Sequence, residues 1–216
     1  MFHRGSILVL ALAAGVLAGC YQLPTPVPPT QPLTDKETAE VLGCQKAIAR
    51  ASASFMNTAT SQLAGCARGA VALRIDEERK SEELPKKRET LAKSCNAAFG
   101  RVGKASTKMF DAMMAACGPV EDLVLTDATR GDPLAFRSFA LYWDDVTSGE
   151  VVIDSVDDVA SRICSAQVAS VFQAVGNQVV RISDAAAVYL GVDVDALRAH
   201  VGTFLHPRCN EELEAL

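Results

Sequence analysis

The chain has 216 residues, a formal net charge of −5, 49% hydrophobic residues and seven cysteines. This length suits one domain or at most two, and it is enough to bury a core without help from disulfides. The mild acidity argues against a nucleic-acid binder, which would carry a basic face, and the abundance of apolar residues excludes wholesale disorder.

The first twenty residues have the pattern of an export signal. Arg4 supplies a positive charge, an apolar run follows from 7 to 17, and small residues precede Cys20. The run is shorter than the ~20 apolar residues that a membrane-spanning helix needs, and it fits the apolar part of a secretory signal. The tetrapeptide LAGC, which ends at Cys20, resembles the lipobox of bacterial lipoproteins.

The resemblance to these lipoproteins implies cleavage before Cys20, a thioether-linked lipid on its sulfur and acylation of the new amino terminus. Residues 1–19 are then a signal peptide, and the proline-rich stretch 20–33 is an extended tether. Tyr21 stands where an aspartate commonly signals retention in the inner membrane, so the resemblance favours the outer membrane. We therefore expect a protein of the bacterial cell envelope that is bound to a membrane through Cys20, with this covalent lipid as its only cofactor.

Residues 34–119 predict a helical hairpin, which is two helices joined by a turn. Thr34 and Glu37 form the capping-box pattern of a helix start. Apolar residues then recur at three- and four-residue steps, which is the period of an amphipathic helix. The Gly-Pro pair at 118–119 ends the second helix.

The connector of this hairpin, residues 74–89, is almost entirely charged and has Pro85 near its end. Mixed charges of this kind are typical of a solvated helix extension and turn. Two glycines, Gly100 and Gly103, lie within the second helix, and each weakens it by ~1 kcal/mol relative to alanine.

Four cysteines of the hairpin have matched spacing: Cys66 follows Cys44 by 22 positions, and Cys117 follows Cys95 by 22 positions. Along one helix 22 residues advance ~33 Å, too far for a disulfide. Antiparallel helices would instead pair Cys44 with Cys117 and Cys66 with Cys95. A parallel register also fits the spacing, but its 28-residue connector would have to run back along a whole helix. We therefore predict the antiparallel pairs.

Residues 120–155 interrupt the helical period and predict a linker. An Asp-Pro pair starts a short helix over about 132–143, and 150–154 suggest a strand or an extended segment. Four aromatic side chains gather in this linker: Phe136, Phe139, Tyr142 and Trp143. Core filling between the hairpins is the simpler interpretation, because aromatic side chains bury large areas. A surface for a protein partner is the alternative, because Tyr and Trp are frequent in binding hot spots.

Residues 156–216 predict a second hairpin. Ser155 with Asp158 marks the start of its first helix, and its last helix is expected to end at Pro207. A turn near residue 191 would bring Cys164 and Cys209 together, so we predict a third disulfide between them. The expected fold class is all-α, with two antiparallel helical hairpins stapled by disulfides and joined by an aromatic-rich irregular segment.

Candidate catalytic and metal-binding residues are few. His200 and His206 are six residues apart, which places them on opposite faces of a helix, so we expect two surface histidines and no metal site. Adjacent carboxylates at 144–145 and 157–158 point apart on a helix and predict caps or solvated charge. No phosphate-binding loop, nucleophile elbow or CxxC motif is present in the sequence. We therefore expect no catalytic residues and no enzyme activity.

The function expected from the sequence is that of a non-enzymatic lipoprotein of the cell envelope. Its disulfide-stabilised helical body would be a structural or protein-interaction module, with another envelope protein as partner and no nucleic acid. The alternative is a binder of a small apolar ligand held between the two hairpins.

Overall fold

The structure is a computed structural model that describes residues 31–79, 83–126, 153–178 and 194–214. Within these ranges the regular structure is entirely helical. The main helices are α2 (Asp35–Glu78), α3 (Leu84–Cys117), α5 (Val156–Gln178), α7 (Val194–Gly202) and α8 (Pro207–Glu214). A short 3-10 helix (Gly118–Val120) and a π-helix (Asp122–Thr126) follow α3. The all-α class predicted from the sequence is confirmed for these ranges.

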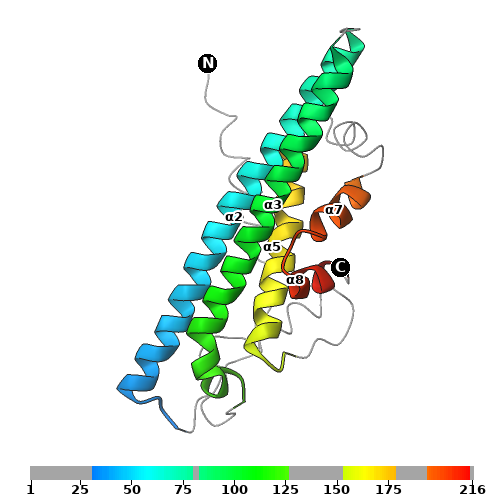
Figure 1. Ribbon diagram of the computed structural model, residues 1–216. Helices are drawn as coiled ribbons and strands as arrows, with labels where there is room; N and C mark the ends of the chain where they lie inside the picture. The colour runs from blue at the N-terminus through cyan, green and yellow to red at the C-terminus, as the bar shows by residue number, and fades with distance from the viewer. Residues whose placement is uncertain (1–30, 80–82, 127–152, 179–193, 215–216) are drawn as a thin grey trace, which may run out of the picture.

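The two longest helices, α2 and α3, lie side by side and antiparallel along most of their length (Figure 1). Disulfides join them at two levels, with Cα–Cα distances of 4.7 Å for Cys44–Cys117 and 5.1 Å for Cys66–Cys95. These are the pairs that the antiparallel reading of the cysteine spacing predicts. The two levels fix the register of one helix against the other, because a slip by one helical turn, ~5.4 Å, would separate both pairs of Cα atoms beyond disulfide reach.

Local signals set the ends of this helix pair. The Thr34 hydroxyl accepts from the Glu37 backbone N–H at 3.3 Å, and the Glu37 carboxylate accepts from the Thr34 N–H at 2.7 Å, which completes the capping box. Pro85 lies in the first turn of α3, where a missing N–H costs no hydrogen bond. The charged ends of the two helices pair with each other, and Lys87 donates to Asp76 at 2.8 Å.

Helix α5 packs along the α2–α3 pair and closes the core (Figure 1). Phe55 of α2, Phe99 of α3 and Val171 of α5 belong to one buried cluster. Helix α8 lies against α5, and the Cys164–Cys209 disulfide joins these two helices with a Cα–Cα distance of 5.5 Å. The third predicted cysteine pair is therefore also present in the structure.

The C-terminal region differs from the expected long last helix. Helix α7 ends at Gly202, and Pro207 begins α8, so the prediction that Pro207 ends a helix is wrong. The physical reason is that proline has the backbone angle of a helix start and lacks only an N–H that the first turn leaves unpaired. The turn between the two short helices passes directly over α3, where Gly103 is buried.

Several predicted features lie outside the described residues. They are the signal peptide with Cys20, most of the tether, the expected helix 132–143 and the aromatic cluster of Phe136, Phe139, Tyr142 and Trp143. Of the expected strand at 150–154, only residues 153 and 154 are described, and they are neither helix nor strand. None of the helices in the described ranges combines the length and the apolar character that crossing a membrane requires.

Candidate functional site

Acidic residues are distributed very unevenly along α2 and α3. Residues 41–75 and 90–110 contain no Asp or Glu, although the whole chain has 26. The same two segments carry the cations Lys46, Arg50, Arg68, Arg74, Lys93, Arg101, Lys104 and Lys108. Because α2 and α3 are antiparallel and joined at two levels, the acid-free segments lie next to each other and create a basic region on an otherwise acidic protein.

A groove of about 730 Å³ lies between α2 and α3 in this region. Four cations line it: Arg50 from α2, and Arg101, Lys104 and Lys108 from α3. We call it the basic groove. The rest of its lining is made of short side chains, mainly alanine, together with Met109, and it includes no acidic residue. Short side chains leave the space between the two helices open, so the groove is a concave surface with positive walls.

Helix geometry places the cations of α3 in one row. Arg101, Lys104 and Lys108 follow at steps of three and four residues, so their side chains share one face of the helix. All three are exposed, and Arg50 is exposed on the opposite wall. The Arg101 Nε donates to Gln62 Oε1 of α2 at 2.7 Å, which holds this guanidinium across one end of the groove.

The other three cations of the groove have no ion pair within the described part of the chain. Three lysines elsewhere in this part are paired, among them Lys87 with Asp76 at 2.8 Å and Lys93 with Glu89 at 2.6 Å. Two unit charges at roughly 8 Å repel by about 0.5 kcal/mol in water, so four neighbouring cations create a local potential that favours an anion.

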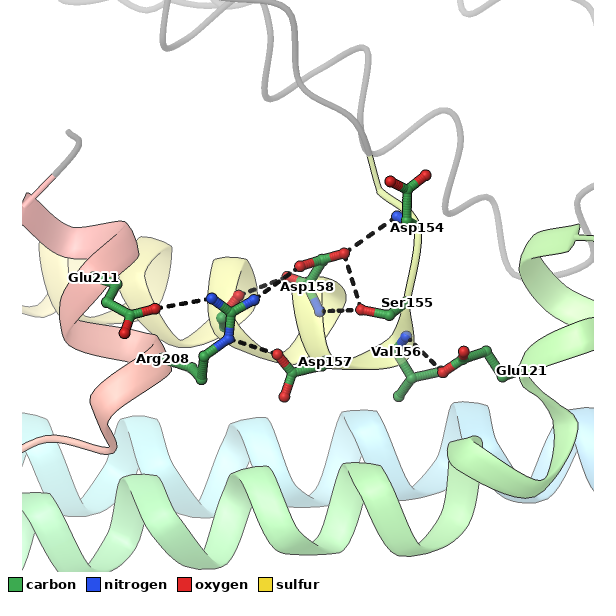
Figure 2. A network of polar contacts seen from close by, with 9 residues as sticks. Glu121, Asp154, Ser155, Val156, Asp157, Asp158, Arg208 and Glu211 are labelled. Carbon is green, nitrogen blue, oxygen red and sulfur yellow. Dashed lines mark hydrogen bonds and ion pairs between the residues drawn. The ribbon is translucent and has the colours of Figure 1, made fainter.

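A second polar cluster joins α8 to the start of α5 (Figure 2). The Arg208 guanidinium donates to Asp157 at 2.6 Å, to Asp158 at 3.0 Å and to Glu211 at 2.8 Å. The hydrogen bond to Asp157, followed by that to Glu211, raises the pKa of Arg208 above its ordinary value. With three carboxylates engaged by one guanidinium, this cluster is a structural clasp between two helices.

The same cluster caps α5, as the sequence predicts. The Asp158 N–H donates to the Ser155 hydroxyl at 3.1 Å, and the Asp158 carboxylate accepts from that hydroxyl at 2.9 Å. The Val156 N–H donates to the Glu121 carboxylate at 3.0 Å, which also links the end of the first helix pair to α5 (Figure 2). Ser155 with Asp158 therefore caps α5 as predicted, whereas the expectation that the carboxylates of 157 and 158 point apart is wrong, because both accept hydrogen bonds from Arg208.

The two histidines are half-buried, so the expectation of surface histidines is wrong. The His206 ring stacks on Phe110 with 3.9 Å between ring centroids, and the His200 ring meets Phe99 edge-on at 5.8 Å. Both contacts exist because the turn after α7 folds back over α3, which sequence spacing does not reveal. No three potential metal-ligating side chains gather within the described ranges.

Sequence reasoning missed the basic groove because it used the net charge of the whole chain. The readable signal was the distribution of acids: two long segments without Asp or Glu, in a chain with more acids than bases. Comparison with protein-family models, with curated proteins and with solved structures finds no match to this chain.

Proposed function

We propose that this protein is a non-enzymatic lipoprotein of the bacterial cell envelope, anchored through Cys20, whose helical body is a protein-interaction module. The observation that carries the envelope assignment is the pairing of the other six cysteines in three disulfides. Disulfides persist in oxidising compartments outside the cytoplasm, which is where the lipobox-like signal would direct the chain. The seventh cysteine is then the residue that carries the lipid.

The shape of the helix pair supports the interaction role. Helix α2 has 44 residues and is ~66 Å long at 1.5 Å per residue. Two disulfides clamp it to α3, so the pair presents a rigid surface. A rigid surface loses little conformational entropy when a partner binds. The extended proline-rich tether would hold this surface up to ~40 Å from the lipid, at ~3.1 Å per residue.

An apolar ligand between the hairpins was the alternative from the sequence. The groove that the structure describes is walled by Arg50, Arg101, Lys104 and Lys108. Burying an apolar molecule there would desolvate these cations without giving them a partner, which is unfavourable. The basic groove, which lies within the first hairpin between α2 and α3, is therefore unsuited to an apolar ligand.

Metabolic labelling with an alkyne-bearing fatty acid tests the anchor. We expect the wild type to be labelled and membrane-bound, and Cys20→Ser to lose both properties. The double variant Cys66→Ser with Cys95→Ser is the matched control, because it also replaces cysteines, here those of a disulfide, but should keep its label. Persistent labelling of Cys20→Ser would contradict the proposal.

Photo-cross-linking in intact cells tests the interaction role. A photoreactive residue at the exposed position 54 or 97 of the α2–α3 pair is expected to capture one envelope protein reproducibly. Absence of any adduct from both positions would contradict an interaction module.

A further inference from the structure

We propose that the basic groove between α2 and α3 binds an extended acidic segment of a partner protein. This inference deepens the proposed function, on which it rests, because it names the chemistry of the partner. It is carried by the charge of the groove, by its shape and by its position between two disulfides.

The charge of the groove is suited to several carboxylates at once. Arg50, Lys104 and Lys108 are exposed, have no ion pair among the described residues and have no acidic neighbour in the lining. The acids that come next along the two helices are Glu40, which pairs with Lys36 at 3.7 Å, and Asp111. Neither lines the groove, although Asp111 lies one helical turn after Lys108 and offsets part of the charge at that end.

The dimensions of the groove suit an extended chain. Its lining on α3 runs from Arg101 to Ala112, which spans ~16 Å at 1.5 Å per residue. An extended peptide rises ~3.3 Å per residue, so about five residues would fill this length. Arg101 to Lys104 and Lys104 to Lys108 are steps of ~4.5 and ~6 Å along the axis. Alternate side chains of an extended peptide repeat at ~6.6 Å, so flexible lysine and arginine side chains would reach successive carboxylates.

Two disulfides bracket the groove. Cys44–Cys117 lies beyond one end and Cys66–Cys95 beyond the other. They fix the register of α2 against α3, and therefore the position of Arg50 relative to the cations of α3. A groove whose walls are already in place loses little entropy on binding.

Membrane and nucleic-acid surfaces fit the groove less well. Surfaces that bind a bilayer usually insert Trp, Phe or Leu, and proteins that bind single-stranded nucleic acid stack bases on aromatic rings. The lining contains no aromatic residue, and its one long apolar side chain, Met109, is buried at 2% exposure. A carboxylate-rich peptide needs only the cations and the space between them.

Fluorescence anisotropy tests the proposal on the full mature, lipidated protein in neutral detergent micelles. The probe is fluorescein-labelled octaglutamate at 50 mM salt. We expect binding to the wild type, and at least a tenfold loss of affinity in the double variant Lys104→Glu with Lys108→Glu. The matched control is Lys86→Glu with Lys93→Glu, which makes the same change of net charge on exposed lysines outside the groove lining. We expect the control variant to lose less than threefold in affinity for octaglutamate, because charges outside the groove lie farther from the peptide and are screened by salt. All four lysines are exposed, so circular dichroism should confirm that both double variants fold.

Three results would overturn the proposal. One is no binding of octaglutamate by the wild type. Another is an equal loss in both double variants, which would show a response to net charge alone. The third comes from competition with unlabelled octaglutamate, phosphatidylglycerol in the micelles, or decathymidylate, each compared by its concentration of negative charges. The proposal fails if the lipid or the oligonucleotide displaces the probe at a tenfold lower concentration than octaglutamate does. Each of them leaves lipid labelling of Cys20 unaffected, so failure of this inference is distinguishable from failure of the proposed anchor.

Discussion

A single added methyl group at Gly103 is expected to disturb the docking of the C-terminal helices. Gly103 is buried in α3 beneath the turn that joins α7 to α8. A Cβ atom at this position would lie 2.1 Å from the carbonyl oxygen of Phe204 and 3.0 Å from its carbonyl carbon. A backbone carbonyl cannot rotate away as a side chain can, so the whole turn would have to move.

The turn is held in place by several contacts. The His206 N–H donates to the Ser106 hydroxyl at 2.9 Å, and this hydroxyl donates to the Gly103 carbonyl at 2.8 Å. The Cys164–Cys209 disulfide ties the following helix to α5. A retreat of roughly 1 Å, which is needed to restore ordinary van der Waals separation, would break the first of these hydrogen bonds.

The expected magnitude follows from three contributions. Overpacking costs ~1–3 kcal/mol, and loss of the Ser106–His206 hydrogen bond costs ~1 kcal/mol. The gain in helix propensity from glycine to alanine returns ~1 kcal/mol. Gly103→Ala should therefore lower the free energy of unfolding by about 1–3 kcal/mol. Gly100→Ala is the matched control, because a Cβ at Gly100 meets nothing within 4 Å, and it should raise stability by ~1 kcal/mol.

Urea unfolding of the oxidised protein, followed by circular dichroism at 222 nm, measures both changes. The two variants should shift the urea midpoint in opposite directions. In a thermal unfolding experiment, each kcal/mol would correspond to ~2–4 °C in the melting temperature of a domain of this size. The reasoning is refuted if Gly103→Ala is as stable as Gly100→Ala, because the contact with Phe204 would then have no energetic weight.

Three further predictions concern the polar clasp, the charged end of the hairpin and a disulfide. Arg208→Gln should lower the free energy of unfolding by ~1 kcal/mol in urea titrations, since its partly exposed ion pairs are screened by water. Hydrogen bonds from two arginines, Arg74 and then Arg88, hold the pKa of Glu77 below its ordinary value of 4.5. The stability that this contact contributes is therefore present above about pH 4.5 and lost as the pH falls below it, so the melting temperature should fall less in Glu77→Gln than in the wild type between pH 5 and 3. Replacing both cysteines of the 66–95 disulfide by serine should cost ~2–4 kcal/mol, measured by the same urea titration.

Each of these predictions has an outcome that contradicts it. Unchanged stability of Arg208→Gln would mean that the clasp around Asp157 makes no net contribution. Parallel pH profiles for Glu77→Gln and the wild type would show that this carboxylate titrates normally. A 66–95 double variant as stable as the wild type would mean that packing alone clamps α2 to α3.

Much of the α2–α3 pair is predictable because its signals are local or periodic. Thr34 and Glu37 mark the helix start within four residues. The pairing of Cys44 with Cys117 follows from equal spacing, the fixed rise of a helix and a connector that favours antiparallel helices. Only the charge of the basic groove was predictable from the sequence, and its shape was not. Its acid-free segments can be counted in the sequence, but the open space between them depends on which short side chains of the two helices face each other.

The C-terminal region shows where sequence reasoning ends. Gly100 and Gly103 look alike in the sequence, yet one faces open space and the other lies against the Phe204 carbonyl. Pro207 is compatible both with the end of one helix and with the start of the next, and the chain uses it as a start. His206 acquires its stacking partner Phe110 from a segment nearly one hundred residues earlier.

Helix content, the starts of α2 and α5, the disulfide register and the lipobox-like signal were therefore readable from the amino-acid order. Each depends on residues close together in the chain or on a regular repeat of known geometry. Close approach of α3 to the C-terminal turn, partial burial of the histidines and the basic groove came from packing. These features depend on contacts between distant segments, and such contacts are set by how whole helix faces fit together rather than by any local pattern.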